Sequence, residues 1–596
     1  MRWLLLCSLS LLIASAFAQT VTLGGGNCNG ITVLTSSSYT PPNWTQTADG
    51  YKTICGDGLD GPRMDASRFL AQATLGANLE LIQKVADEGS AQWLDEQLAS
   101  QPSYVLPVTM SIYQEIVTNF LANGGDSSDV GYRPYWSAFQ YGYWHHLMTG
   151  GESQKVRERV ALALSEIFVI SMNSDLSGFG DGLASYYDLF NKNAFGNYED
   201  LLMDVALHPA MGFYLSHLNN PKTIEEENIH PDENFAREIM QLFSIGLYEL
   251  NEDGSRKTDG SGNWMPTYGQ QDIKNLAKVF TGLGLSGVVP NEYVDGAEFG
   301  LGIWVGDMTH PMRMYEDWHE PGEKIIVGNY TIASGQSGMA DIAEAIHTLF
   351  MHPNVGPFIG KQLIQRMVTS NPSPAYVARV TQAFNDNGQG ERGDMKAVIR
   401  AILLDPEART CAALESPTHG KLVEPLIRYT QFSQALPLEQ YDNKFWNIGY
   451  DFWEATGQAP LGAPSVFNFF LPDYQPIGPI AQQSLIAPEF QIHNTKTSVG
   501  YINQVNNWTA SNYVMANWED QPWVVLNTDE LTPLARDPEV LLNRLDVLFT
   551  HGQLTDRTRS IIKSALEPIQ RGDYRDDRVR LALYLLLISP DYAIFK

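Results

Sequence analysis

The chain has 596 residues and a formal charge of −29, because 39 lysines and arginines stand against 68 aspartates and glutamates. Apolar residues make up 44% and charged residues only 18%. This length and composition permit about three to four domain-sized units with a large core, and they argue against wholesale disorder. The acidic balance argues against a nucleic-acid binder, which needs a basic surface to displace counterions from phosphates, and against docking on anionic lipid.

The first residues predict a secretory signal. Arg2 gives a positive start, residues 4–13 are apolar, and Ala16-Phe17-Ala18 has the small-x-small pattern that places cleavage before Gln19. The apolar stretch is too short to span the hydrocarbon layer of a bilayer, which is about 30 Å thick. We therefore expect residues 1–18 to be removed and the protein to be secreted, to the periplasm or beyond, without membrane insertion after cleavage.

The segment 19–62 is rich in Gly, Ser, Thr and Asn, which predicts loops or short strands. In an oxidising compartment Cys28 and Cys55 are the natural disulfide pair, and their bond would contribute a few kcal/mol. Cys411 is left over, and we interpret it as a small buried apolar residue. The scattered cysteines do not form a zinc site.

From Ala66 onward the apolar residues recur with helical periodicity. The segment 155–171 is apolar nearly all round, so we expect a long central helix there. The other predicted helices are 66–74, 78–88, 91–100, 198–207, 233–245, 271–281, 340–351, 356–369, 374–386, 393–404, 419–435, 538–549, 556–568 and 577–588. We therefore predict a mainly α fold, a large single or two-lobed helical domain, with a core domain over 63–500 and a C-terminal helical region over 501–596.

Few segments have the pattern of strands, and 324–327 and 523–526 are the candidates. The stretches 250–268, 283–335 and 440–535 are rich in Gly, Pro, Asn and aromatic residues, which predicts long irregular loops. Loops of that length inside a compact domain are usually functional or form the walls of a cleft. Their aromatic side chains would suit stacking on sugars, and they would equally suit an interface or a core.

The chain has no HExxH, GxSxG, Walker A or strand-following GxGxxG pattern, so the candidate chemistry lies in carboxylates set into apolar helix faces. At 100° per residue, Glu238 projects between Leu242 and Ile245, with Asn234 at the border of that face and Arg237 nearly opposite. Glu238 is therefore the acid/base candidate.

Two further helices carry a carboxylate on an apolar face. Asp272 projects between Leu276 and Val279, and Glu166 lies between Leu162 and Ile170. A buried carboxylate is costly unless it is paired or protonated. The functional interpretation is a cleft in which Glu166, Glu238 and Asp272 meet for acid–base work or to hold a cation. The structural interpretation is ion pairs with Arg63, Arg68, Arg159 or Arg366, or a helix-start contact for Asp272.

The segment 317–324 adds a histidine, several acids and a lysine to one loop. His319 is a candidate base or metal ligand and Lys324 a candidate substrate contact, although a surface turn fits equally well. For an anionic or hydroxylated substrate group, the candidate binding residues are Arg237, Arg68 and Asn234. No signature in the sequence names a cofactor.

Several of these residues lie in segments that resemble one known family. The matching segments are 66–76, 159–171, 234–246, 271–282, 319–324, 392–400, 421–428 and 464–473. Their order and residues resemble the signature of the bacterial family named Domain of Unknown Function 1800, from about residue 64 almost to the end of the chain. The resemblance implies a large, secreted, mainly helical bacterial protein. It also suggests a secreted partner related to sulfatases and alkaline phosphatases, and it implies no catalytic residues.

Three hypotheses follow from these patterns. The first is a secreted enzyme, hydrolase-like, that acts on an extracellular polymer or glycan through Glu238, Asp272, Glu166 and His319. The second is a non-enzymatic binding or assembly protein, in which the carboxylates are structural ion pairs and the aromatic loops form the binding surface. The third is a metal-binding protein that uses the acidic cluster and His319. If the three carboxylates meet at a cleft, the first or third gains; if each is sealed against an arginine, the second gains.

Overall fold

The structure is a computed structural model, and it describes residues 19–23, 31–35, 44–46, 52–54, 61–289, 296–409, 418–439, 450–511, 524–572 and 574–596, with the single residues 416, 448 and 514. The predicted signal at 1–18 lies outside the described residues, and so do Cys28, Cys55 and Cys411, so the predicted cleavage and disulfide stay predictions. The described part of segment 19–62 contains two antiparallel pairs, β1 (Gln19–Leu23) with β2 (Ile31–Thr35) and β3 (Trp44–Gln46) with β4 (Lys52–Ile54).

The rest of the described chain is mainly helical, as predicted. In chain order the helices are α1 (Gly61–Ala73), α2 (Leu79–Glu88), α3 (Ser90–Leu98), α4 (Val105–Ala122), α5 (Trp136–Thr149), α6 (Lys155–Ser165), α7 (Gly180–Asn193), α8 (Tyr198–Leu207), α9 (Pro209–Tyr214), α10 (Asn234–Gln241), α11 (Gln270–Val279), α12 (Gly338–Met351), α13 (Val355–Met367), α14 (Pro374–Asn385), α15 (Met395–Leu403), α16 (Pro406–Arg409), α18 (Pro425–Ala435), α19 (Tyr450–Thr456), α20 (Pro479–Gln482), α21 (Thr495–Thr509), α22 (Pro538–Leu545), α23 (Asp556–Leu566), α24 (Tyr574–Leu587) and α25 (Pro590–Ala593).

The remaining strands form short antiparallel pairs between the helices. These are β5 (Leu283–Gly284) with β6 (Arg313–Met314), β7 (Lys324–Ile326) with β8 (Tyr330–Ile332), β9 (Lys421–Leu422) with β12 (Ile594–Phe595), and β10 (Leu438–Glu439) with β11 (Val525–Leu526). The strand predicted at 324–327 is therefore confirmed as β7. The pairing of β9 with β12 joins segments that lie far apart in the sequence.

Local sequence explains where many helices begin. Asn78 accepts a hydrogen bond from the main-chain N–H of Leu81 at 3.0 Å and so caps α2. Proline occupies the first helical position of α14 and α22, directly after a capping serine or aspartate. Proline suits that position because its missing N–H would have no partner inside the helix.

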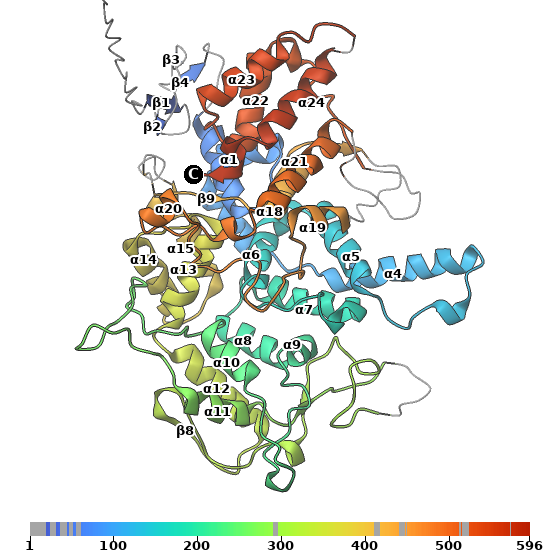
Figure 1. The fold of residues 1–596 in the computed structure, drawn as a ribbon, viewed down its shortest axis with the longest axis vertical. Helices are drawn as coiled ribbons and strands as arrows, with labels where there is room; N and C mark the ends of the chain where they lie inside the picture. Colours follow the sequence, from blue (N-terminus) through green and yellow to red (C-terminus); the bar gives the residue numbers. More distant parts are fainter. Residues whose placement is uncertain are drawn as a thin grey trace, which may run out of the picture.

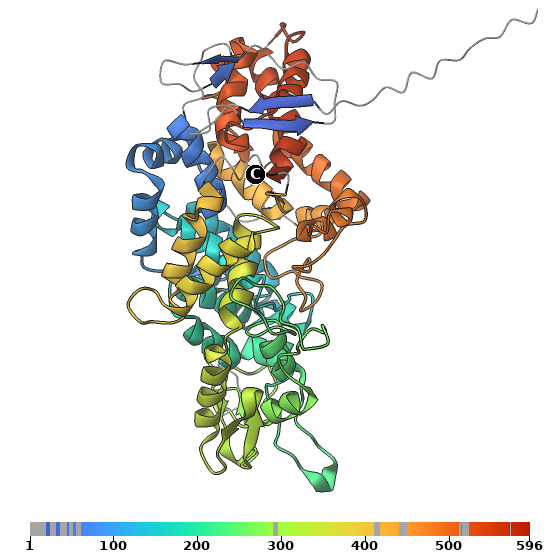
Figure 2. The same ribbon diagram turned by 90° about the vertical axis from the view of Figure 1, so that its left-hand side faces the viewer.

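One continuous apolar core runs through the described helices, from Met64 to Phe595. Figure 1 shows an elongated molecule with α6 near its middle, α10, α11 and α12 toward one end, and α22, α23 and α24 toward the other. Figure 2 shows the same elongation from the side. Every residue of α6 after its first is buried, which confirms the prediction that this helix is central.

Two sequence predictions about elements need correction. The helix expected over 155–171 ends at Ser165; beyond it the N–H groups of Ile167 and Phe168 both donate to the carbonyl of Leu164, and the N–H of Met172 donates to the carbonyl of Leu461 at 2.8 Å. The stretch 440–535 was expected to be irregular but contains α19 and α21. The domain boundary expected at residue 500 falls inside α21.

Candidate functional site

Glu166 directly follows the last residue of α6 and belongs to a buried network of charges. Its Oε2 lies 3.5 Å from Nε of Arg366, and Nη2 of Arg366 donates to its main-chain oxygen at 2.9 Å. The amide of Gln458 donates to Oε2 of Glu424 at 2.6 Å and approaches Oε1 of Glu166 at 3.5 Å. The structural interpretation of Glu166, an ion pair with Arg366, is therefore the one that the geometry confirms.

We call this set of side chains the charge network. It combines three cations and three carboxyl groups from α6, α13, the segment 421–424 and the turn 488–491, all of them at most 7% exposed: Arg159, Arg366, Lys421, Glu166, Glu424 and Glu489. Nζ of Lys421 lies 2.9 Å from Oε1 of Glu489. Burial, followed by the neighbouring Glu424 carboxyl group, raises the pKa of Glu166 well above its usual range, while Arg366 acts in the opposite direction.

Glu238 lies on the buried face of α10, as its helical position predicted, and is 5% exposed. Its Oε2 has no hydrogen-bond partner among the described residues. Burial raises its pKa, while Arg237 acts in the opposite direction. Burial and the Glu238 carboxyl group also raise the pKa of Tyr268 to about 12.

Asp272 is used at the start of its helix. Its Oδ2 accepts a hydrogen bond from the main-chain N–H of Gly269 at 2.8 Å, in the first turn of α11. The predicted helix-start contact is therefore confirmed, and Asp272 is only partly buried. A carboxylate in this position also interacts favourably with the positive end of the helix dipole.

The prediction that Glu166, Glu238 and Asp272 meet is wrong. Among the described residues no hydrogen bond or ion pair joins Glu166 to either of the other two. Figure 1 shows α6 near the middle of the molecule, whereas α10 and α11 lie toward one end. Helical periodicity specifies which face of a helix is buried, but it does not specify which neighbour that face meets.

His319 and Lys324 are not exposed loop residues, because both are buried around Asp341 in the first turn of α12. Nε2 of His319 lies 3.0 Å from Oδ2 of Asp341, and its Nδ1 donates to the carbonyl of Thr281 at 2.9 Å. Nζ of Lys324 donates to the same Asp341 oxygen and to the carbonyl of Gly322 at 2.9 Å. Both ring nitrogens of His319 and the ammonium group of Lys324 therefore contact protein atoms. These contacts fit a structural role, in which they hold the loop against α12.

The predicted substrate-binding residues are dispersed. Arg237 is half-exposed and lies 3.4 Å from Glu233, four residues earlier on the same segment, and Asn234 is exposed at the start of α10. Arg68 is buried at 3% exposure, with Nε donating to the main-chain oxygen of Lys596 at 3.1 Å. Burial and the adjacent Arg409 lower the pKa of Arg68 to about 9. These three residues do not surround one ligand position.

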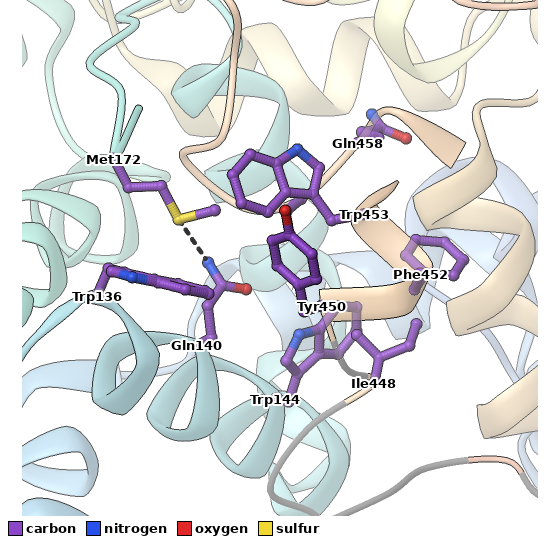
Figure 3. Close-up of a pocket in the computed structure, with 10 residues that line it drawn as sticks. Trp136, Gln140, Trp144, Met172, Ile448, Tyr450, Phe452, Trp453 and Gln458 are labelled. Carbon is purple, nitrogen blue, oxygen red and sulfur yellow. Dashed lines mark hydrogen bonds between the residues drawn. The ribbon is translucent and has the colours of Figure 1, made fainter. Parts of the chain in front are cut away.

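A pocket with aromatic walls lies between α5 and the segment that includes α19 (Figure 3). We call it the aromatic pocket. Its lining consists of Trp136, Gln140, Trp144, Met172, Ile448, Tyr450, Phe452, Trp453, Gln458 and Ala459.

The rim of the aromatic pocket is exposed and its floor is buried. Tyr450 is 45% exposed, Trp136 and Trp453 are half-buried, and the floor residue Trp144 is fully buried. The rings of Trp136 and Trp453 meet edge to face with their centroids 6.1 Å apart, and those of Tyr450 and Trp453 are 5.5 Å apart. Figure 3 shows these rings gathered around the side chain of Gln140.

Polar groups of the aromatic pocket lie among the rings. The amide of Gln140 donates to the carbonyl of Pro460 at 2.9 Å and contacts the sulfur of Met172 at 3.4 Å. The indole N–H of Trp144 is buried and has no hydrogen-bond partner among the described residues. Buried donors in native proteins nearly always have a partner, so this N–H calls for a water molecule or a ligand atom.

Gln458 connects the aromatic pocket to the charge network. It lines the aromatic pocket and also a second small pocket, which Glu166, Ser165 and Asn468 share. Its side chain is fully buried and binds Glu424. The two pockets therefore share a wall, and Glu166 is the predicted catalytic residue that borders this region.

Sequence reasoning missed Glu424, Gln458 and the aromatic rim. Glu424 lies inside the helix predicted over 419–435, whereas the structure begins α18 at Pro425, and nothing local indicated that Glu424 would lie near Glu166. Trp453 and Tyr450 lie in the aromatic-rich stretch 440–535, which was expected to line a cleft. Trp136 lies outside the three long loops, and only the spatial meeting of α5 and α19 brings it to the rim.

No group of three or more His, Cys, Asp or Glu side chains in the described ranges is arranged to hold a metal ion. Within the same ranges, no helix combines the length and apolar character needed to cross a bilayer.

Comparison with known proteins gives a family and no further relative. No curated protein and no solved structure matches the chain. A family model described as "Protein of unknown function (DUF1800)" matches residues 68–594, which is nearly the whole sequence and includes the charge network and the aromatic pocket. The chain therefore belongs to the DUF1800 family.

Proposed function

We propose that this is a secreted protein that binds a saccharide chain of an extracellular polymer at the aromatic pocket. The observation that carries the proposal is the exposed rim formed by Trp136, Tyr450 and Trp453 above a floor with an unpartnered indole N–H. The predicted signal at 1–18 supports the extracytoplasmic location. Such a protein would hold the polymer for a secreted enzyme, the partnership that the family resemblance suggests.

Stacking explains why a sugar suits this rim. A pyranose ring has an apolar face of C–H groups that packs on the electron-rich face of an indole or phenol ring, and its hydroxyl groups bind nearby amides. Binding pockets generally combine aromatic walls with a few polar groups that fix orientation. Trp136 and Trp453 supply the walls here, and Gln140 supplies an amide.

Two further exposed aromatic residues lie on segments that pack next to Trp136, which favours a chain over a single sugar. Tyr135, the residue before Trp136, is 60% exposed, and its carbonyl oxygen lies so close to Gly180 that a Cβ on residue 180 would not fit. The neighbour of Gly180 is the fully buried Phe179, which packs against Trp304 with ring centroids 4.8 Å apart. Trp304 is 54% exposed.

The test is a sedimentation assay with insoluble cellulose, chitin, xylan, β-1,3-glucan and peptidoglycan. We expect the wild-type protein to bind at least one of these polymers. Trp136→Ala and Trp453→Ala should each weaken that binding about tenfold or more, which is about 1.4 kcal/mol or more. Trp264→Ala is the control, because Trp264 is a surface tryptophan, 52% exposed, that packs on Tyr248 and Arg256 and does not line the pocket.

Two results would contradict the proposal. One is that the folded wild-type protein binds none of the five polymers. The other is that it binds one of them and that both rim variants bind as tightly as Trp264→Ala. Melting curves of all three variants separate lost binding from lost folding.

A second candidate function is favoured by the place of Glu166. It borders the pocket that shares Gln458 with the aromatic pocket, and burial together with the neighbouring Glu424 raises its pKa well above the usual range. A carboxyl group with a raised pKa can act as the general acid in glycoside hydrolysis, with a second carboxyl group as its partner. In this candidate function, a polymer that is bound at the rim is also cleaved.

Reducing-end release from the polymer that the protein binds tests this second function. If Glu166 and Glu424 catalyse hydrolysis, the release of reducing ends should disappear in Glu166→Gln and in Glu424→Gln. Both variants should still bind the polymer. Binding without any release of reducing ends would leave the protein as a binding protein and reject the hydrolase.

A further inference from the structure

Ser103, in the loop between α3 and α4, contacts a histidine in the geometry of an activated nucleophile. Its Oγ lies 2.8 Å from Nε2 of His146 on α5. Ser103 is partly exposed and His146 is 9% exposed, so the hydroxyl is accessible while the imidazole is held in place. A serine becomes a nucleophile when an adjacent base can remove its proton at this distance.

A carboxyl group faces the other ring nitrogen of His146. Oε1 of Glu158 on α6 lies 3.9 Å from Nδ1 of His146 and has no hydrogen-bond partner among the described residues. The absence of a side chain at Gly150 makes room for Glu158, because a Cβ on residue 150 would lie 2.6 Å from Oε1 of Glu158. Catalytic hydrogen bonds are often long before substrate binds and shorten in the complex.

Comparison with the other serine–histidine contacts separates this group from structural ones. Oγ of Ser67 lies 2.8 Å from Nδ1 of His551, and Oγ of Ser185 lies 3.0 Å from Nε2 of His208. In the described part of the chain neither of these imidazoles has a hydrogen bond or ion pair with a carboxylate, and both serines are buried. A third contact, with Oγ of Ser498 3.3 Å from Nε2 of His493, lies at the surface, and that imidazole also has no hydrogen bond or ion pair with a carboxylate among the described residues. Of these four contacts within the described part of the chain, only that of Ser103 has an imidazole that a carboxyl group faces.

The main chain around Ser103 is fixed and leaves one donor for an oxyanion. The N–H of Ser103 donates to Oε1 of Gln154 at 3.2 Å, and Nε2 of Gln154 donates to the carbonyl of Gln101 at 2.9 Å. The next N–H, that of Tyr104, has no hydrogen bond within the described residues, whereas Val105 and Leu106 donate to Asp188. The residue after a nucleophile supplies an oxyanion donor in many hydrolases.

We propose that Ser103 is the nucleophile of an esterase site, with His146 as its general base and Glu158 as a positioning residue. Oγ of Ser103 attacks the carbonyl carbon of an ester as its proton passes to Nε2 of His146. The tetrahedral intermediate collapses, the C–O bond to the alcohol breaks, and His146 returns the proton to the departing alkoxide. Water then hydrolyses the acyl–Ser103 ester by the same route, so that ester and water become acid and alcohol.

The surroundings of Ser103 specify the substrate class. The serine lies at the surface beside Tyr104, which is 39% exposed, and not at the bottom of a tunnel that would hold a long acyl chain. A short acyl group, such as acetyl, carried on a larger alcohol fits this position. The attacked ester then enters from open solvent, with the alcohol part outside.

This esterase site goes beyond the proposed saccharide binding and is independent of it. Trp136, Gln140 and Trp144 recur every four residues along α5 and face the aromatic pocket. His146 lies two residues after Trp144, about 200° around the helix, so it faces the opposite side. Loss of Ser103 should therefore leave polymer binding unchanged.

The test is covalent labelling of the full chain with a fluorophosphonate probe, followed by mass spectrometry of the labelled peptide, and hydrolysis of p-nitrophenyl acetate. We expect the label on Ser103 and at least a hundredfold loss of both signals in Ser103→Ala and His146→Gln. Ser185→Ala is the matched control, because it removes a serine–histidine contact without a carboxylate. It should react like the wild type.

The role of Glu158 is tested by the pH profile of labelling. Burial raises the pKa of Glu158 to about 8 against the opposing effect of Lys155, and burial and His145 lower that of His146 to about 4. Tyr143 and Tyr187 also face this carboxyl group. Ionised Glu158 holds the proton on Nδ1 and leaves Nε2 free to accept one, so labelling should rise as the pH passes 8, and Glu158→Gln should abolish that rise.

Three outcomes overturn the proposal: a folded wild-type protein that the probe does not label between pH 7 and 9, a label on another residue, or equal labelling of Ser103→Ala. The first two need no variant, so they decide the matter even if a substitution prevents folding.

Discussion

The charge network and the aromatic pocket share Gln458 but differ in which side chains reach solvent. In the network all the charged side chains are buried, and Glu166, Arg366 and Lys421 each contact protein groups of opposite charge or main-chain oxygens, although individual atoms of Arg159, Arg366 and Glu489 lack a hydrogen-bond partner within the described residues, as the indole N–H of Trp144 does. In the pocket, aromatic rings face solvent at the rim. Buried charge therefore marks a place where the protein binds itself, whereas exposed rings mark a place suited to another molecule.

The largest expected effect comes from removing one partner of the charge network. Arg366→Ala removes one of the three cations of the charge network, the one whose Nε lies 3.5 Å from Glu166, and we expect it to lower the free energy of unfolding by about 3–5 kcal/mol. The control is Arg400→Ala, which removes an exposed pair with Asp95 and should cost less than about 1 kcal/mol. Urea unfolding of both variants measures the difference, and equal losses would contradict the account.

The next effect concerns the rim, where binding should change and stability should not. Tyr450→Ala should weaken polymer binding about threefold to tenfold, or about 0.7–1.4 kcal/mol. Because Tyr450 is 45% exposed, the substitution should change the free energy of unfolding of the protein by no more than about 0.5–1 kcal/mol. A large loss of stability with unchanged binding would make Tyr450 a packing residue.

The pH dependence of stability tests the burial of Glu158. Its pKa is raised from 4.5 to about 8 in the folded protein, so the folded chain keeps a proton that the unfolded chain has lost. The contribution of this group is therefore fully present below about pH 4.5 and is lost as the pH rises through 8. Glutamine resembles the protonated form, so Glu158→Gln should melt like the wild type at pH 4 and at a higher temperature at pH 9.

The smallest expected effect belongs to Asp272. Its carboxylate binds the N–H of Gly269 at the start of α11, so Asp272→Ala should cost about 0.5–2 kcal/mol, the range for lost helix caps. Polymer binding and ester hydrolysis should both stay at wild-type levels. Loss of either activity in a folded Asp272→Ala protein would restore Asp272 to a catalytic role.

The sequence predicted local features well, and it predicted contacts between residues that are far apart in the chain poorly. The buried positions of Glu166 and Glu238 and the helix-start role of Asp272 follow from helical periodicity and from the chemistry of helix ends, which are local. The pairs Glu166–Glu424 and Trp136–Trp453 join residues that lie hundreds of positions apart, and no local pattern specifies them. The same limit applies to Ser103, whose partners come from two later helices.

One structural measurement tests the central claim most directly. It is the crystal structure of the protein in complex with an oligosaccharide of the polymer that it binds in the sedimentation assay. The account predicts a sugar ring packed on Trp136 or Trp453, with a ligand or water oxygen bound to the N–H of Trp144. An oligosaccharide bound elsewhere, with the aromatic rim empty, would contradict the account.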